Sequence, residues 1–286
     1  RSRGLGDVYK RQVLIGSIRD KKRLDEVFET YHPTVVFHAA AHKHVPLMEV
    51  SPAEAVKNNV LGTKNLLVSA SEHDVERFVQ LSTDKAVNPT SVMGCTKRIC
   101  EMLIQTFAGN TDMKCVAVRF GNVLGSHGSV IPLFEAQIKK GGPVTLTDPN
   151  IERYFMTIPE AAQLVLQAGA LAESGSIYVL DMGEPVKIMD LAKQLIRFYG
   201  YEPGVNMEIK IVGLRPGEKL YEELMMDEEQ DKMRRTQHNK IFVASPRSID
   251  LAEFYGQLQE LAAAAEHNDE GVVCLLYTSP SPRDRG

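Results

Sequence analysis

The chain has 286 residues and carries 33 Lys and Arg against 37 Asp and Glu, a formal net charge of −4. This acidic balance argues against nucleic acid or an anionic membrane surface as the main partner. The four cysteines form no C-x-x-C pair, which indicates a reducing compartment such as the cytoplasm rather than a disulfide-bonded scaffold. No apolar run reaches the roughly 18 residues that are needed to cross a bilayer.

Both ends of the chain resemble translated adapter DNA of the transposon-library type. Residues 7–12 can be encoded by DNA whose opposite strand encodes Cys-Leu-Leu-Tyr-Thr-Ser, which is the sequence of residues 274–279. We therefore predict that residues 1–12 and 274–286 are adapter-derived tails, and we leave them out of the fold prediction. The tails hold six basic and two acidic residues, which leaves 27 basic and 35 acidic residues between them.

Strands and helices alternate along residues 13–125, which is typical of an α/β domain with a mainly parallel sheet. Residues 34–39 form a continuous apolar run, as in a parallel strand that is buried on both faces. Ser51, Pro52 and Glu54 combine an N-cap, a proline at the first helical position and a capping-box glutamate. A helix should therefore extend to about residue 72, followed by a strand over 77–82, a helix over 93–108 and a strand over 115–120.

Beyond Gly125 the pattern loosens into loops and shorter elements. Helices are expected at about 130–139, 159–170 and 188–199, with strands near Val144, Ile177 and Ile209. These elements predict a smaller substrate-binding lobe over residues 126–250, interleaved with the last strands of the sheet. A C-terminal helix is expected over residues 251–273.

The candidate active site lies where the strand over 77–82 ends. Thr83 is followed by Asp84 and Lys85, and Met93 stands four residues before Lys97. A thioether cannot exchange a proton, so Met93 cannot act as a general base. Asp84 and Lys85 are two extra ionisable groups, which a simple alcohol dehydrogenase does not need and a dehydratase does. The alternative is that both residues belong to a solvated turn.

Five motifs carry a resemblance to extended short-chain dehydrogenases/reductases that act on nucleotide sugars. These motifs occupy residues 38–46, 58–63, 83–85, 119–126 and 215–219. More closely, residues 13–250 resemble bacterial polysaccharide-biosynthesis dehydratases that convert UDP-N-acetylglucosamine to a 4-keto-6-deoxy sugar, in the type where methionine replaces the active-site tyrosine.

The resemblance implies an α/β, Rossmann-like doubly wound parallel sheet with a smaller C-terminal substrate lobe. Residues 13–125 would form the dinucleotide-binding domain, with its first strand-turn-helix and glycine-rich turn upstream of Val13. This segment alone is therefore expected to be inactive, and the choice between NAD and NADP stays open. Long members of the family carry membrane helices, so we expect a cytoplasmic domain that reaches the inner membrane only through an upstream region. A homo-oligomer stays open as well.

The resemblance also implies residue roles. Thr83 would hydrogen-bond O4 of the sugar, Asp84 would protonate the leaving C6 hydroxyl, Lys85 would be the base at C5, and Lys97 would bind the cofactor ribose. We expect Thr83 to accept the O4 proton, with Asp84 or Lys85 as the next group in the proton path. Met93 is expected to serve only in packing. Cofactor contacts are implied for Ile18, Ala39, Ala40, Ala41, Asn59, Lys97 and Val123. UDP-sugar contacts are implied for Lys43, Asn122, Ser129, Val130, Ile131, Arg153, Arg215 and Glu218.

Three other interpretations compete with this one. His38, His42 and His44 suggest a zinc site, but they begin at a strand end, where i and i+4 side chains do not converge, so no metal is expected. A non-catalytic dinucleotide-binding sensor would explain Met93, although the retained Thr83 and Lys97 argue against it. A C4 epimerase on the same substrate needs no base at C5, so the pair after Thr83 favours the dehydratase.

Overall fold

The computed structural model describes residues 12–126, 128–230, 232–244 and 249–278. A six-stranded sheet is its centre, and the first four strands are parallel: β1 (Val35–His38), β2 (Arg77–Leu81), β3 (Lys114–Arg119) and β8 (Ile177–Leu180). Two strands in antiparallel pairings complete it: β12 (Ile241–Ala244) pairs with β8, and β11 (Arg234–Arg235) pairs with β12. The predicted tails fall mainly on residues 1–11 and 279–286, outside the described residues.

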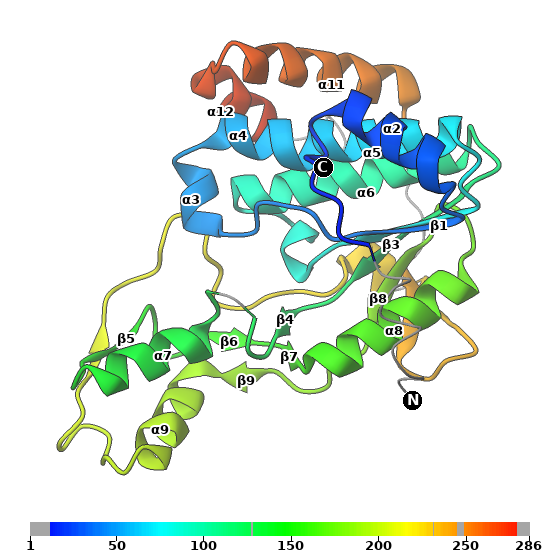
Figure 1. The fold of residues 1–286 in the computed structure, drawn as a ribbon. Helices are drawn as coiled ribbons and strands as arrows, with labels where there is room; N and C mark the ends of the chain where they lie inside the picture. The colour runs from blue at the N-terminus through cyan, green and yellow to red at the C-terminus, as the bar shows by residue number, and fades with distance from the viewer. Residues whose placement is uncertain (1–11, 127, 231, 245–248, 279–286) are drawn as a thin grey trace.

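Helices cover both faces of the sheet (Figure 1). Alternate strand residues point to opposite sides, so Phe78 and Cys115 belong to one apolar cluster while Val79 and Val116 belong to another. The first cluster packs under α2 (Lys21–Tyr31), α5 (Gly62–Glu72), α6 (Val92–Ala108) and α11 (Leu251–Glu266). The second packs under α8 (Ile158–Leu171). The predicted α/β, Rossmann-like doubly wound fold is confirmed.

The prediction that the first strand is buried on both faces was wrong. β1 lies at the edge of the sheet and pairs only with β2 among the described strands. Val35 and Phe37 are 40% and 43% exposed, although the ring of Phe37 lies next to Gly169 of α8. An apolar run predicts a strand but does not say which neighbours it has.

The helix predicted from residue 51 to 72 is present but changes its winding. It starts as α4 (Pro52–Ala55), loosens into the π-helical turn η1 (Val56–Leu61) and continues as α5. Ser51 is the N-cap residue, but its side chain makes no capping bond, and Glu54 pairs with Arg19 at 2.8 Å instead of closing a capping box. π-helical turns often occur at functional sites.

The smaller lobe consists of α7 (Val130–Lys139), α9 (Ile188–Phe198) and the parallel pair β5 (Val144–Leu146) and β10 (Ile209–Ile211). Phe134, Ile138 and Ile196 form its apolar core. In Figure 1 the lobe stands apart from the helical layers, beyond the end of the sheet. Two-residue strands connect it to the sheet: β4 (Asn122–Val123), β6 (Glu152–Arg153), β7 (Phe155–Met156) and β9 (Val186–Lys187).

The predicted C-terminal helix is divided in two. α11 ends at Glu266, Asn268 has φ of 53°, and α12 (Glu270–Thr278) follows. No helix among the described residues is both long and apolar enough to span a membrane. The remaining short elements are α3 (Val45–Glu49), η2 (Asp84–Ala86) and α10 (Asp227–Gln230).

Candidate active site

A cavity of about 500 Å³ lies between the carboxyl ends of the parallel strands and the smaller lobe. This is the edge at which open α/β sheets bind ligands. Most of the residues that the sequence singled out line it: Ala39, Ala41, Lys43, Thr83, Lys85, Met93, Lys97, Asn122, Val123, Ser129, Val130, Arg153, Arg215 and Glu218.

Five of the predicted site residues do not line the cavity: Ile18, Ala40, Asn59, Asp84 and Ile131. Asn59, in the π-helical turn, is 1% exposed and accepts a hydrogen bond from the backbone N–H of His42 while donating to its carbonyl. It therefore holds the loop after β1 rather than facing a ligand. Ile18 packs against Gly62, where a Cβ atom would lie only 2.7 Å from its side chain.

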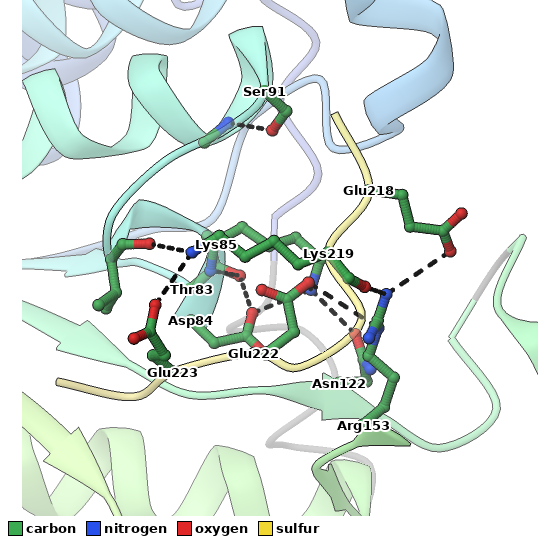
Figure 2. A network of polar contacts seen from close by, with 12 residues as sticks. Thr83, Asp84, Lys85, Ser91, Asn122, Arg153, Glu218, Lys219, Glu222 and Glu223 are labelled. Carbon is green, nitrogen blue, oxygen red and sulfur yellow. Dashed lines mark hydrogen bonds and ion pairs between the residues drawn. The ribbon is translucent and has the colours of Figure 1, made fainter. Parts of the chain in front are cut away.

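Thr83, Asp84 and Lys85 form a compact polar group at the end of β2 (Figure 2). Thr83 caps the short helix η2, and its hydroxyl donates to Asp84 Oδ1 at 2.8 Å. The same oxygen accepts from Lys85 Nζ at 3.0 Å, and Lys85 Nζ also lies 3.4 Å from Asn122 Oδ1. The Asp84 side chain is fully buried, whereas Thr83 and Lys85 line the cavity. Asp84 thus lies away from the cavity, whereas Thr83 and Lys85 face it.

Electrostatics keep Lys85 protonated in this arrangement. Burial alone would lower the pKa of the Lys85 ammonium, but the charges of Asp84 and Glu222 outweigh that effect and hold the pKa above its ordinary value. A base at C5 has to be a neutral amine. Lys85 can therefore act as that base only after it has lost a proton to another group.

Glu222 lies beside Lys85 and belongs to none of the sequence motifs described above. Its Oε1 lies 3.5 Å from Lys85 Nζ and 3.8 Å from Arg153 Nε, and its side chain is 3% exposed. Burial, and then the charge of Asp84, raises the pKa of Glu222. The only hint in the sequence is its position four residues after Glu218, because its partners come from distant parts of the chain.

Lys97 and Met93 project from the first turns of α6. Lys97 Nζ donates to the carbonyl of Leu81 at 2.6 Å, and burial lowers its pKa. Met93 is 4% exposed and belongs to an apolar cluster with Met48 and Val92. Met93 thus packs among apolar side chains and also lines the cavity.

Arg153 holds the segment over residues 215–223 against the site. Its guanidinium donates to the carbonyls of Lys219 and Leu220 at 2.7 and 3.1 Å, and it lies 3.5 Å from Glu218 Oε1. Arg215, by contrast, is exposed at the rim of the cavity. Its guanidinium could pair with a phosphate in the bidentate way that arginine favours.

The described residues contain no cluster of three or more His, Cys, Asp or Glu side chains that could hold a metal ion. His38 is buried, and its Nε2 lies 2.8 Å from Thr63 Oγ1. Burial, assisted by the charge of Lys97, lowers the pKa of His38 to about 3, so the ring is neutral. Its hydrogen bond and burial give it a structural role.

The fold and the site together define an extended short-chain dehydrogenase/reductase: a hydroxyl residue stands two positions after the end of a parallel strand, and a buried lysine follows on the next long helix beside the cavity. The profile of the family described as "Polysaccharide biosynthesis protein" matches residues 6–246. The chain belongs to this family, and the resemblance predicted from its motifs is confirmed.

Two relatives show how far the similarity extends. The capsular polysaccharide biosynthesis protein CapD of Staphylococcus aureus is 61% identical over 213 residues, which make up 74% of this chain and 35% of the relative. The chain thus spans about a third of that protein. A UDP-glucose 4-epimerase of Rickettsia canadensis is 37% identical over 285 residues, covering 94% of this chain and 81% of the relative.

Solved structures share the fold. Pen from Bacillus thuringiensis superposes with a TM-score of 0.75 at 38% identity, over 82% of this chain and 71% of that one. The UDP-glucose 4-epimerase of Thermus thermophilus, solved in complex with NAD, gives a TM-score of 0.65 at 25% identity, over 71% of this chain and 72% of that one.

Proposed function

We propose that this chain carries the active site of a nucleotide-sugar 4,6-dehydratase, which converts UDP-N-acetylglucosamine to a UDP-4-keto-6-deoxy-N-acetylhexosamine for surface polysaccharide synthesis. The observation that carries the proposal is the hydrogen-bonded group of Thr83, Asp84 and Lys85 at the cavity, with a packed Met93 where a tyrosine base would stand. Elimination of water requires an acid and a base in addition to an oxidising group, and this group offers both.

The cofactor that fits is NAD or NADP. Ala39 and Ala41 line the cavity at the end of β1, and their small side chains leave room for a ring close to the backbone. Lys97 also lines the cavity, with an ammonium that could bind ribose hydroxyls. When bound, the cofactor would accept a hydride from C4 and return it to C6. The Thermus thermophilus epimerase, which shares the fold, contains NAD.

The residues of the chain would move the protons. The O4 proton passes to Thr83 and on to Asp84 through their 2.8 Å hydrogen bond. Lys85, as an amine, removes the C5 proton, and the C6–O bond breaks. Asp84 returns its proton to the leaving hydroxyl through Thr83 or Lys85, since it does not reach the cavity itself. Lys85 finally gives a proton back to C5 as the hydride reaches C6, so one water is lost overall.

The UDP moiety would occupy the side of the cavity that the smaller lobe forms. Asn122, Arg215 and Lys43 are polar candidates for the diphosphate, and Glu218 for the ribose, while Ser129 and Val130 lie at the start of α7. Ile131 does not line the cavity, so its proposed contact with uridine requires a shift of α7.

The test uses the full-length protein with UDP-N-acetylglucosamine in deuterated water, with C4, C5 and C6 followed by NMR. Deuterium at C5 together with loss of the C6 hydroxyl supports the proposal. UDP-N-acetylgalactosamine as the sole product would overturn it.

A C4 epimerase is the second candidate, because the Rickettsia canadensis relative with that name covers 94% of the chain. The same NMR experiment separates the two reactions. A non-catalytic sensor would show neither product. A cytoplasmic location for this domain is part of the proposal.

A further inference from the structure

The Lys85 ammonium lies between two buried carboxyl groups from different parts of the chain (Figure 2). Asp84 Oδ1 is 3.0 Å away, and Glu222 Oε1 is 3.5 Å away. Their side chains are 0% and 3% exposed, whereas that of Lys85 is 21% exposed toward the cavity. Glu222 thus touches the proposed base from behind without lining the cavity itself.

Each of the two carboxyl groups keeps one buried oxygen without a hydrogen-bond partner among the described residues, Asp84 Oδ2 and Glu222 Oε2. Two buried negative charges beside one ammonium leave an excess of charge that is costly in a medium of low dielectric constant. The Arg153 guanidinium, whose Nε lies 3.8 Å from Glu222 Oε1, adds a second positive charge, but Glu218 Oε1 lies 3.5 Å from the same guanidinium, so three carboxylates surround two cations. A proton on one carboxyl group would relieve this excess.

We propose that Glu222 is a positioning residue that accepts a proton from the Lys85 ammonium and so turns Lys85 into the amine that attacks the C5 proton. An N–H bond of Lys85 breaks, an O–H bond forms on Glu222 Oε1, and the ion pair becomes a neutral amine and a carboxylic acid. After Lys85 has taken the C5 proton, it is an ammonium again. Once Lys85 has returned that proton to C5, the carboxylic acid of Glu222 gives its proton back to Lys85 and the ion pair is restored. This inference rests on the proposed dehydratase function.

The occupied cavity favours the transfer. A bound sugar excludes water from the exposed part of Lys85, and loss of water disfavours charged forms of both partners. The distance of 3.5 Å is one that a small side-chain rotation shortens to a hydrogen bond, as is common when a substrate binds. Asp84 keeps its hydrogen bond from Thr83 and remains available for the O4 proton.

The test compares Glu222→Gln with wild type in the full-length protein loaded with NAD. Glutamine keeps the shape of the side chain but accepts no proton. We expect deuterium exchange at C5 to fall about 10²-fold at pH 7, the usual size of a lost acid-base contribution. Oxidation at C4, measured as the absorbance of reduced nicotinamide, should change by less than about 3-fold because it does not need the Lys85 amine. The exchange should recover as the pH rises, since removal of the Glu222 charge lowers the pKa of Lys85.

Two further variants serve as controls. Glu223→Gln alters the neighbouring carboxylate, which is 46% exposed and pairs with Lys219, so its exchange rate should match wild type. Glu222→Asp restores a proton acceptor and should recover part of the exchange at pH 7. A Glu222→Gln variant with wild-type exchange at every pH would overturn the inference, as would equal loss of C4 oxidation and C5 exchange with no recovery at high pH. Wild type that makes no 6-deoxy product would overturn the proposed function, and the inference with it.

Discussion

Arg119 and Glu101 form a bidentate ion pair in which both side chains are completely buried, with hydrogen bonds of 3.1 Å and 2.8 Å. The pair joins β3 to α6, and Glu101 also accepts from the hydroxyl of Ser82, the residue before Thr83. Arg119 also pairs with Glu229 at 2.8 Å, which joins α10 to the same network.

Removal of one partner should destabilise the fold strongly. Glu101→Gln leaves the buried Arg119 charge only partly compensated, and such losses typically cost about 3–5 kcal/mol. Urea unfolding of the variant and wild type measures the difference. Arg23→Gln, which breaks an exposed pair at 3.3 Å, is the control and should cost less than about 1 kcal/mol. Equal losses for the two variants would contradict this account of the network.

The same pair predicts how stability depends on pH. Burial raises the pKa of Glu101, but the charge of Arg119 outweighs it and lowers the pKa from 4.5 to about 2. A depressed folded-state pKa stabilises the protein above the unfolded value, and this contribution is lost as pH falls from about 4.5 to about 2. The difference is worth about 3 kcal/mol. Unfolding measured between pH 6 and pH 2 should therefore show a steep acid limb that Glu101→Gln flattens.

Lys85 is expected to be indispensable for product formation. Lys85→Ala should reduce formation of the 4-keto product by about 10²–10⁴-fold, the range for loss of a general base. The exposed Lys140, on the smaller lobe, provides a matched control, and Lys140→Ala should keep the wild-type rate. The measurement is product formation by NMR. Turnover of Lys85→Ala near the wild-type level would remove Lys85 from the mechanism.

Met93 is expected to contribute packing and not proton transfer. Met93→Leu keeps nearly the same volume, so it should cost less than about 1.5 kcal/mol and change turnover only a few-fold. Met93→Ala opens a cavity beside Met48 and Val92 and should cost about 2–5 kcal/mol. Thermal unfolding and turnover are measured on both variants. A large loss of turnover in Met93→Leu without loss of stability would assign Met93 a chemical role.

Local patterns predicted the helices well and the site only in part. The amphipathic pattern of α7 begins and ends clearly in the sequence, so the predicted bounds match the observed ones, Val130–Lys139. Strands such as Asn122–Val123 contain only two residues and leave no periodicity to detect. Thr83 and Lys97 were found because both belong to one short motif. Glu222 was not, because its approach to Lys85 depends on the path of a segment 137 positions further along the chain.

The close packing of α6 on the turn that carries Lys85 leads to the last prediction. A Cβ atom at Gly94 would clash with the backbone carbonyl of Lys85, which cannot move without shifting η2, the short helix that carries Lys85. Gly94→Ala should therefore lower turnover and stability together, in spite of the higher helix propensity of alanine. Gly256 lies in α11 with open space around its Cα, so Gly256→Ala should stabilise the protein by about 0.5–1 kcal/mol at unchanged turnover. Thermal unfolding and NMR assays of both variants test the pair, and a stabilised, fully active Gly94→Ala would refute the contact.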